Sequence, residues 1–408
     1  KKTKRMLVKS TLYQLGAGSI IKILGFLTTA ILYRIYSLNE IGNYFVLISL
    51  LAIFISLQQI GADKPLIKYN IRNKKENEHE ILKTKFVLSL IFFPIFYFIA
   101  SYKFDIFTNL TIAFIGITLI LNVISLDYIL VAKKKFLSLS LIQLVSQFLL
   151  FAFFLLALIF SSKPLIIFHQ IIPTFLLSFF VLIYVLTKKN INLISILNSN
   201  LISLSYFTKN KILIFCNIFL PLITTLDYFL ASKILEGDDL GLMSGLYRYS
   251  LLSYGFLLII NKILFSYALN TKNSKNFKSS RNFLLLLYKV ISFFGLLILI
   301  YPYLKFVMNL KDISMLIYPS LIIVFSFLLM PKFFTEINKI ESSEKKISFF
   351  LVSTIFLSAL SIYYFGSIYL SVFIAEANLI LFLSIVFSLK WILITIISNY
   401  VAKKYNIK

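Results

Sequence analysis

The sequence predicts an all-α integral membrane protein with about twelve transmembrane helices, and three observations carry this prediction. Apolar residues make up 59% of the 408 residues, enough for about twelve spans of roughly 20 residues each. Charged residues are only 14%, whereas a soluble domain carries about 25%. The apolar residues stand in long continuous runs, which suit helices rather than the alternating strands of a membrane β-barrel.

The same composition excludes several classes of protein. So few polar residues cannot cover a cytosolic enzyme, a nucleic-acid-binding module or a secreted domain, despite a net charge of +25. The lone cysteine, Cys216, excludes an intramolecular disulfide. The sequence has no glycine-rich phosphate loop and no His/Cys cluster with the spacing of a metal site. We therefore expect no enzymatic activity, no catalytic residues, no cofactor, no bound metal and no nucleic-acid partner.

The apolar runs between polar breaks place twelve spans in order along the chain. They lie near residues 11–34, 41–62, 86–101, 107–131, 136–160, 164–186, 210–233, 240–268, 283–303, 313–333, 347–365 and 367–389. The basic segment from Lys1 to Lys9 leads into an apolar run too long for a signal peptide, so we expect a retained first helix. A final apolar stretch, Trp391 to Val401, is too short to span, and we expect it at the membrane interface.

The distribution of positive charge predicts the orientation of the helices. Most of the 41 lysines and arginines lie in the two terminal tails and in every second connection, while the other connections carry few. Lys and Arg accumulate on the cytoplasmic side of membrane proteins. We therefore expect a multi-pass protein with both termini in the cytoplasm. The net charge is then mainly this orientation signal, together with attraction to anionic headgroups.

An internal repeat divides the twelve spans into two sets of six. Arg34 begins a segment in which an acid, an aliphatic residue and Gly42 follow at fixed spacing. Lys233 begins a matching segment that ends at Gly241, about half a chain length later. Each segment joins the first and second spans of a six-helix set, so the two halves are expected to share one orientation in the membrane.

The repeat predicts two lobes and a linker. Residues 1–190 form the expected N-terminal lobe and residues 210–408 the expected C-terminal lobe. Between them, residues 191–209 carry apolar side chains spaced among Asn and Ser on the predicted cytoplasmic side. That spacing suits an amphipathic helix on the membrane surface, and a plain linker between the lobes explains it equally well.

Several short motifs at the helix junctions carry a family resemblance. They are the small residues from Gly16 to Ser19, Lys22 to Gly25, Tyr33 to Tyr44, Leu57 to Gly61, Leu226 to Tyr228, and Asp239 to Gly241. With the layout of six and six helices, these motifs make the chain resemble a Wzx-type polysaccharide (O-antigen) flippase of the multidrug/oligosaccharidyl-lipid/polysaccharide (MOP) superfamily. The pair Leu242 and Met243 departs from the family pattern, in which an aromatic residue often follows the glycine.

What this resemblance implies is a bundle of two six-helix lobes around a central cavity, in a bacterial inner membrane. The implied activity moves an undecaprenyl-pyrophosphate-linked oligosaccharide from the inner to the outer leaflet by alternating access, for cell-surface polysaccharide synthesis. The implied partners are this lipid-linked oligosaccharide, membrane lipids, a proton or sodium counter-ion, and a polysaccharide polymerase with its chain-length regulator. We expect a monomer.

Cations inside the spans are candidate substrate-binding residues, because a charge at mid-bilayer costs about 2.5–3.5 kcal/mol. Lys22 is the deepest and shares a helix face with small and polar residues, namely Gln14, Gly18, Gly25 and Thr29. Arg248 and Lys262 share a face of the eighth span. We hypothesise that Lys22 and Arg248 attract the pyrophosphate or acidic sugars, with Lys262 at the cytoplasmic entrance. The alternative for the small-residue face is close packing between helices.

Acidic residues inside the spans are candidates for ion coupling. Glu376 lies near the middle of the twelfth span, and Asp227 lies toward the outer end of the seventh. Burial of a carboxyl favours proton uptake. The alternative for Glu376 is a structural ion pair with Lys22 or Arg248. Arg34 and Lys233 stand at outer helix ends, where each is a candidate gate residue or simply holds the acid that follows it.

Two other functions compete with the flippase. One is a MATE-like exporter of drugs or small molecules from the same superfamily. An exporter of cationic drugs is expected to have an acidic or neutral cavity, whereas the cavity predicted here is basic. The other is a non-transporting scaffold of a polysaccharide-assembly complex. A scaffold gains nothing from the cost of charges buried in several spans.

Overall fold

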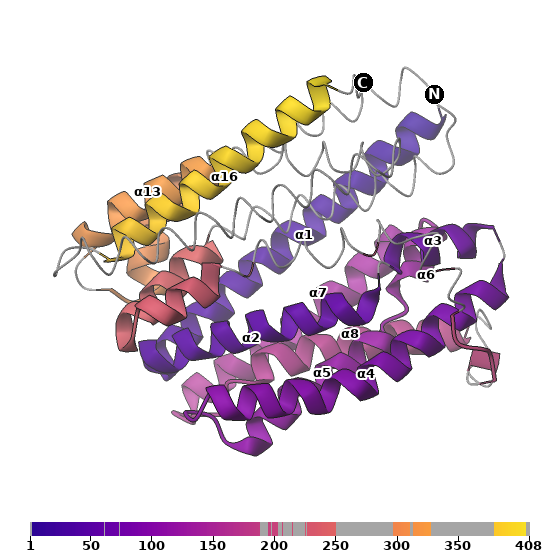
Figure 1. Ribbon diagram of the computed structural model, residues 1–408, viewed down its shortest axis with the longest axis horizontal. Coiled ribbons are helices and arrows are strands. Elements are labelled where there is room, and N and C mark those ends of the chain that lie inside the picture. The colour runs from indigo at the N-terminus through magenta and orange to yellow at the C-terminus, as the bar shows by residue number, and fades with distance from the viewer. Residues whose placement is uncertain are drawn as a thin grey trace. The chain divides into compact units, whose positions relative to one another are not determined.

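The computed structural model describes residues 2–60, 62–72, 74–187, 195–196, 198–202, 206, 214, 225, 227–249, 297–310, 313–327 and 379–404. Every regular element within these ranges is a helix (Figure 1). The described residues fall into two compact units. The first takes those within Lys1–Leu32 and Leu50–Ile214, and the second takes those within Tyr33–Ser49, Phe215–Leu258 and Asn282–Lys408. Because Tyr33–Ser49 packs in the second unit, the units do not follow the sequence halves there, and the predicted lobe boundaries stay a prediction.

Eight helices follow one another in the first part of the chain. They are α1 (Lys2–Ile35), α2 (Leu38–Gln59), α3 (Asp63–Ile71), α4 (Lys75–Lys103), α5 (Asn109–Ile124), α6 (Asp127–Ala132), α7 (Phe136–Ile159) and α8 (Phe168–Thr187). In Figure 1 they run from indigo to magenta. Thr108 caps α5 by accepting a hydrogen bond from the Thr111 backbone amide at 3.2 Å. Pro94 and Pro173 lie inside α4 and α8, where the helices continue past them.

The described part of the chain contains seven helices that are long and apolar enough to cross a membrane. They are Gly16–Ile35, Leu38–Gln59, Lys75–Lys103, Asn109–Ala132, Phe136–Ile159, Phe168–Thr187 and Leu379–Ile397. The first six coincide with the first six predicted spans within a few residues, except that α4 begins well before the predicted start. Large apolar side chains such as Phe98 and Phe148 are exposed on these helices, as expected of surfaces that face lipid.

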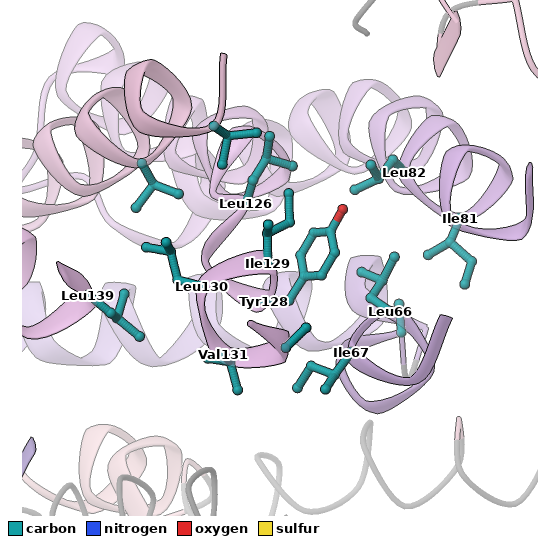
Figure 2. Close-up of a cluster of buried hydrophobic side chains, with 14 of the residues drawn as sticks. Leu66, Ile67, Ile81, Leu82, Leu126, Tyr128, Ile129, Leu130, Val131 and Leu139 are labelled. Carbon is teal, nitrogen blue, oxygen red and sulfur yellow. The ribbon is translucent and has the colours of Figure 1, made fainter. Parts of the chain in front are cut away.

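The segment from Asp63 to Lys85 separates the second and third predicted spans, and most of its described residues are helical. It forms α3 and the first turns of α4. Leu66 and Ile67 of α3 pack with Ile81 of α4 in a buried apolar cluster to which α6, α7 and α8 also contribute (Figure 2). A charged sequence folds as helix here because its few apolar residues recur on one face and find this cluster.

The linker between the predicted lobes docks on the same cluster. Ile202 and Tyr206 are buried in it. The Ile202 amide donates a hydrogen bond to Thr84 Oγ1 at 2.9 Å, and Lys83 Nζ donates to the Ser199 carbonyl at 2.5 Å. Most of residues 191–209 lie outside the described ranges, so the predicted amphipathic helix stays a prediction.

The second unit contains the connected ends of α1 and α2, together with later helices. These later helices are 227–234 and 237–249, a helix at 297–302 that continues as the π-helix η1 (Tyr303–Val307), α13 (Ser314–Phe327) and α16 (Leu379–Lys404). Residues 235 and 236 separate the first two, and Gly237 at the start of the second has a φ of +55°, which glycine adopts without strain. Helices α13 and α16 lie side by side, and Ser388 Oγ donates to the Ile322 carbonyl at 3.1 Å (Figure 1).

The prediction for the C-terminal spans is wrong in one respect. We expected a span at 367–389, followed by a separate interfacial stretch from Trp391 to Val401. The structure instead has one continuous helix, α16, whose apolar span is Leu379–Ile397. We had taken Lys390 as a polar break. A lysine whose charge is paired inside the protein does not end a transmembrane helix, so the span runs through it.

Candidate functional site

The junction of α1 and α2 is a tight connection held by a capping box. Ser37 precedes α2, and its amide and hydroxyl both donate to Glu40 Oε2, at 3.0 and 3.1 Å. The Glu40 amide donates back to Ser37 Oγ at 3.3 Å. This reciprocal arrangement is the capping box that Ser-x-x-Glu sequences form at helix starts. The acid of the repeat therefore caps α2.

Helix 237–249 crosses this junction at the two repeat glycines. A Cβ on Gly42 would lie 2.8 Å from the Gly241 amide nitrogen, and a Cβ on Gly241 would overlap the Leu38 carbonyl oxygen. Only glycine permits such an approach of two backbones. Tyr33 OH donates to the Gly241 carbonyl at 3.2 Å, and Tyr303 OH donates to the Gly245 carbonyl at 2.8 Å. We call this arrangement the glycine crossing.

Arg248 lies on helix 237–249, after Gly241 and Gly245, and has aromatic side chains around it. Its guanidinium carbon stands 4.5 Å from the centre of the Phe45 ring, within cation–π range. Its charge also acts on the hydroxyls of four buried tyrosines, Tyr33, Tyr44, Tyr228 and Tyr303. These six residues form the Arg248 cluster. The hydroxyls of Tyr33 and Tyr303 already donate to backbone carbonyls, so the guanidinium of Arg248 carries the chemistry that suits an anion, a permanent positive charge with several N–H donors.

Lys22 lies on α1 in the first unit and is half-buried. The face on which it stands touches protein farther along the helix. Thr29 is buried, and a Cβ on Gly25 would lie 3.7 Å from Gln147 Nε2 of α7. This part of the face therefore packs against a neighbouring helix, which agrees with the alternative interpretation of the small-residue face as a packing surface. Lys22 and Arg248 belong to different units, and their common cavity stays a prediction.

Asp227 forms a buried ion pair with Lys390. Lys390 Nζ donates to Asp227 Oδ2 at 2.5 Å, and the two side chains are 0% and 3% exposed. The ammonium also stands 4.8 Å from the ring centres of both Phe387 and Trp391. Asp227 Oδ1 has no hydrogen-bond partner among the described residues. The pair joins helix 227–234 to α16.

Lys390 is the main residue that sequence reasoning missed. It lies 163 residues from Asp227, and we had assigned it to the C-terminal tail. One signal was available. Apolar residues continue for several turns beyond Lys390, so a span that includes it places a cation at membrane depth, where a buried acid is its natural partner.

A second buried acid also went unnoticed, this time in the first unit. Glu78 of α4 is 3% exposed and accepts a hydrogen bond from Tyr128 OH at 2.6 Å. Asn70 Nδ2 of α3 donates to both of its carboxylate oxygens, at 3.2 and 3.3 Å. Glu78 thus ties α3 and α6 to the start of α4, where a negative charge also favours the helix N-terminus.

The remaining candidates are partly covered by the structure. Arg34 and Lys233 are exposed at helix ends, and their gate role stays a prediction. Lys262 and Glu376 lie outside the described residues. His169 is buried with its ring centre 6.3 Å from that of Phe154, an arrangement typical of packing. In the described ranges, no group of three or more His, Cys, Asp or Glu side chains is placed to hold a metal ion.

Comparison with known proteins identifies structural relatives. Neither a protein-family model nor a curated protein matches the sequence. Among solved structures, an outward-facing multidrug resistance MATE family transporter of the MOP superfamily superposes with a TM-score of 0.66 at 13% identity, over 98% of this chain and 96% of that chain. A MATE transporter in complex with MaD3S gives 0.65 at 12% identity, over 99% and 97%. A mutant of the Vibrio cholerae MATE transporter VcmN gives 0.58 at 10% identity, over 99% and 97%.

Identities this low show the fold alone. MATE transporters are twelve-helix, all-α membrane proteins, so the predicted fold class is confirmed. The chain therefore has the multi-pass, all-α membrane fold of the MATE transporters of the MOP superfamily.

Proposed function

We propose that this chain is a secondary transporter that flips an undecaprenyl-pyrophosphate-linked oligosaccharide by alternating access. It would lie in a bacterial inner membrane with both termini in the cytoplasm. The observation that carries the proposal is the Arg248 cluster, which holds a permanent cation among buried tyrosine hydroxyls. The fold supports a transporter, and the chemistry of the cluster favours an anionic substrate.

A pyrophosphate group matches the Arg248 cluster in charge and in hydrogen bonding. It carries two or more negative charges and only accepts hydrogen bonds near neutral pH. A guanidinium offers a planar fork of N–H groups that binds two phosphate oxygens at once. Lys22 adds a point charge on α1, in the first unit.

Alternating access requires a contact that closes one side, and the glycine crossing supplies it. The crossing joins the ends of α1 and α2 to helix 237–249, which come from opposite halves of the sequence. By the predicted orientation it lies on the outer side. Two backbones that meet at glycines have no interlocking side chains to separate. Opening therefore costs the hydrogen bond from Tyr33 to the Gly241 carbonyl and a small apolar contact, each worth on the order of 1 kcal/mol.

The second candidate is a MATE-like exporter of drugs or small molecules. Its support is the likeness to multidrug MATE transporters, whose fold this chain shares. The Arg248 cluster distinguishes the two candidates, because a cationic drug would be repelled by the guanidinium and would gain nothing from its N–H donors. The flippase is therefore the better match to this site.

The experiment uses purified protein in proteoliposomes. Transfer of a labelled undecaprenyl-pyrophosphate oligosaccharide between leaflets is measured for the wild type and for Lys22→Ala combined with Arg248→Ala. The exposed Lys305 provides the matched control, since Lys305→Ala removes the same charge from the surface of the second unit. We expect transfer by the wild type and the control, and loss of transfer in the double variant. Extrusion of a cationic drug with no lipid transfer would overturn the proposal in favour of the exporter.

A further inference from the structure

The buried ion pair of Asp227 and Lys390 is separate from the Arg248 cluster, and removing its two charges from water costs free energy. Asp227 and Lys390 are both withdrawn from water, and the two charges pair with each other. Burying such a pair seldom gains stability over apolar residues of similar size. Charged groups inside membrane proteins therefore tend to mark functional positions.

We propose that Asp227 and Lys390 form the binding site of the coupling proton, and that the Lys390 ammonium stands where a sodium ion would otherwise bind. This inference rests on the proposed transport function, which it deepens by naming the coupling ion.

The ammonium bound at Oδ2 of Asp227 competes with sodium for this site. Oδ2 already accepts a hydrogen bond from an ammonium that is tethered to the chain, so its effective concentration greatly exceeds that of a free ion. The ammonium is held further by the faces of Phe387 and Trp391. A hard cation also needs several oxygen ligands. Over the described ranges, no group of three or more His, Cys, Asp or Glu side chains is placed to supply them.

A proton, by contrast, has a place to bind. Asp227 Oδ1 is buried and has no hydrogen-bond partner in the described part of the chain. A proton taken up from water would form an O–H bond there and convert the carboxylate to a neutral carboxylic acid. The hydrogen bond from Lys390 would then lose its charge assistance and the ion pair its attraction. The freed ammonium would keep its positive charge and the two aromatic faces.

The surroundings contain no other described group that would take up this proton first. The titratable and charged groups that face Asp227 are Lys390 of α16, the adjacent Tyr228, and Tyr247 of helix 237–249. The tyrosines carry no charge near neutral pH, and lysine is already protonated. Protonation at Asp227 is therefore the event that changes the net charge of this group of residues.

The proton site is connected to the Arg248 cluster by two aromatic residues. Tyr228 follows Asp227 in sequence and belongs to the cluster, while Tyr247 precedes Arg248. Their ring centres are 5.4 Å apart, and the Tyr247 ring stacks on Phe387 of α16 at 5.2 Å. A shift of α16 away from a neutral Asp227 would move this stack and, through it, the surroundings of Arg248.

The protein carries its own reporter for the pair. Trp391 is the single tryptophan of the chain, it is buried, and it contacts Lys390. We expect the fluorescence of purified wild-type protein to change as the pH is lowered from neutral, because the charges beside the indole change. The change should be absent in Asp227→Asn. Glu78→Gln, which alters a buried carboxylate of the other unit, should keep it.

Sodium binding is tested by the same fluorescence signal and by the melting temperature. Replacing choline chloride with sodium chloride at constant ionic strength should leave the wild-type fluorescence unchanged. In Lys390→Ala, which empties the ammonium position, sodium or methylammonium should raise the apparent melting temperature by about 3 °C or more. If Asp227→Asn does not fold, Asp227→Asn combined with Lys390→Met supplies the comparison without an unpaired buried charge.

The outcomes separate this inference from the transport proposal, because none of these readouts measures transport. A wild-type fluorescence that does not depend on pH, or that depends on it equally in Asp227→Asn, would overturn the proton site. A sodium response of the wild type that Asp227→Asn abolishes would overturn the exclusion of sodium. A preserved titration together with absent lipid transfer would instead refute the proposed substrate.

Discussion

Gly42 and Gly241 occupy equivalent positions of an internal repeat and meet at a crossing where a Cβ on Gly42 would lie 2.8 Å from the Gly241 nitrogen. Two segments from opposite halves of the sequence thus pack backbone to backbone. The repeat was recognisable from sequence, but its glycines could be explained there only as helix-junction residues. Their contact gives them a shared role, which is the closest approach of the α1–α2 junction to helix 237–249.

We expect Gly241→Ala to weaken this crossing. The added Cβ would overlap the Leu38 carbonyl oxygen, and a backbone atom cannot yield as a flexible side chain would. Such overpacking costs about 1–3 kcal/mol. The measurement is maleimide labelling, from outside, of a cysteine at the buried Ser244, in protein whose Cys216 is replaced by serine.

The control for the crossing is Gly16→Ala on α1. A Cβ at Gly16 meets no atom within 4 Å, so labelling and stability should stay at the wild-type level. Equal labelling in Gly241→Ala and Gly16→Ala would show that the glycine contact does not hold this side closed.

Tyr33→Phe and Tyr303→Phe should each destabilise the second unit modestly. Each removes one hydroxyl that donates to a carbonyl of helix 237–249, and such a bond contributes about 1 kcal/mol. Thermal unfolding in detergent gives the measurement. Tyr318→Phe serves as the comparison because Tyr318 is 70% exposed. Melting temperatures indistinguishable from that of Tyr318→Phe would show that the two hydrogen bonds do not stabilise the second unit.

Glu78→Gln should destabilise the first unit more strongly than a surface change. The carboxylate accepts hydrogen bonds from Tyr128 and Asn70, and bonds to a charged group contribute about 1.5–3 kcal/mol. Glu76→Gln, at an exposed position of the same helix turn, should have little effect. A double-mutant cycle with Tyr128→Phe measures the pair directly, and a coupling energy of zero would contradict the contact.

Asp227→Asn should abolish the dependence of transport on a proton gradient, because an amide cannot take up the proton. Transport driven by the gradient is measured in proteoliposomes, with and without sodium. Asp238→Asn, an exposed acid beyond the end of the same helix, is the matched control and should behave as the wild type. Gradient-driven transport that survives in Asp227→Asn would place the coupling elsewhere.

The fold class could be predicted from the sequence because membrane helices are determined locally. Each needs about 20 apolar residues, and the six spans found from α1 to α8 were visible as such runs. Ser37 and Glu40 have the Ser-x-x-Glu spacing of a capping box, so the start of α2 was also predictable from the sequence. The helical segment from Asp63 to Lys85 was missed because its burial depends on a cluster assembled from distant helices.

Functional residues were predictable from the sequence only where a single charged residue inside a span marked the position. Arg248 stood out as a cation inside a span, and the structure surrounds it with tyrosines. Asp227 stood out as an acid, but its partner Lys390 is distant in sequence and ended a predicted span by its charge alone. Pairing across the fold is a three-dimensional property, and a hydropathy pattern assigns the same break to a solvated lysine and to a paired one.

The most direct test of the central claim is lipid transfer by Arg248 variants at equal protein incorporation. Labelled undecaprenyl-pyrophosphate oligosaccharide is followed across the bilayer for the wild type, Arg248→Lys and Arg248→Ala. We predict transfer by the wild type and a partial loss in Arg248→Lys, which keeps the charge but lacks the planar N–H groups of the guanidinium. In Arg248→Ala we predict a loss of about tenfold or more. Absence of transfer by folded wild-type protein, or wild-type rates in Arg248→Ala, would contradict it.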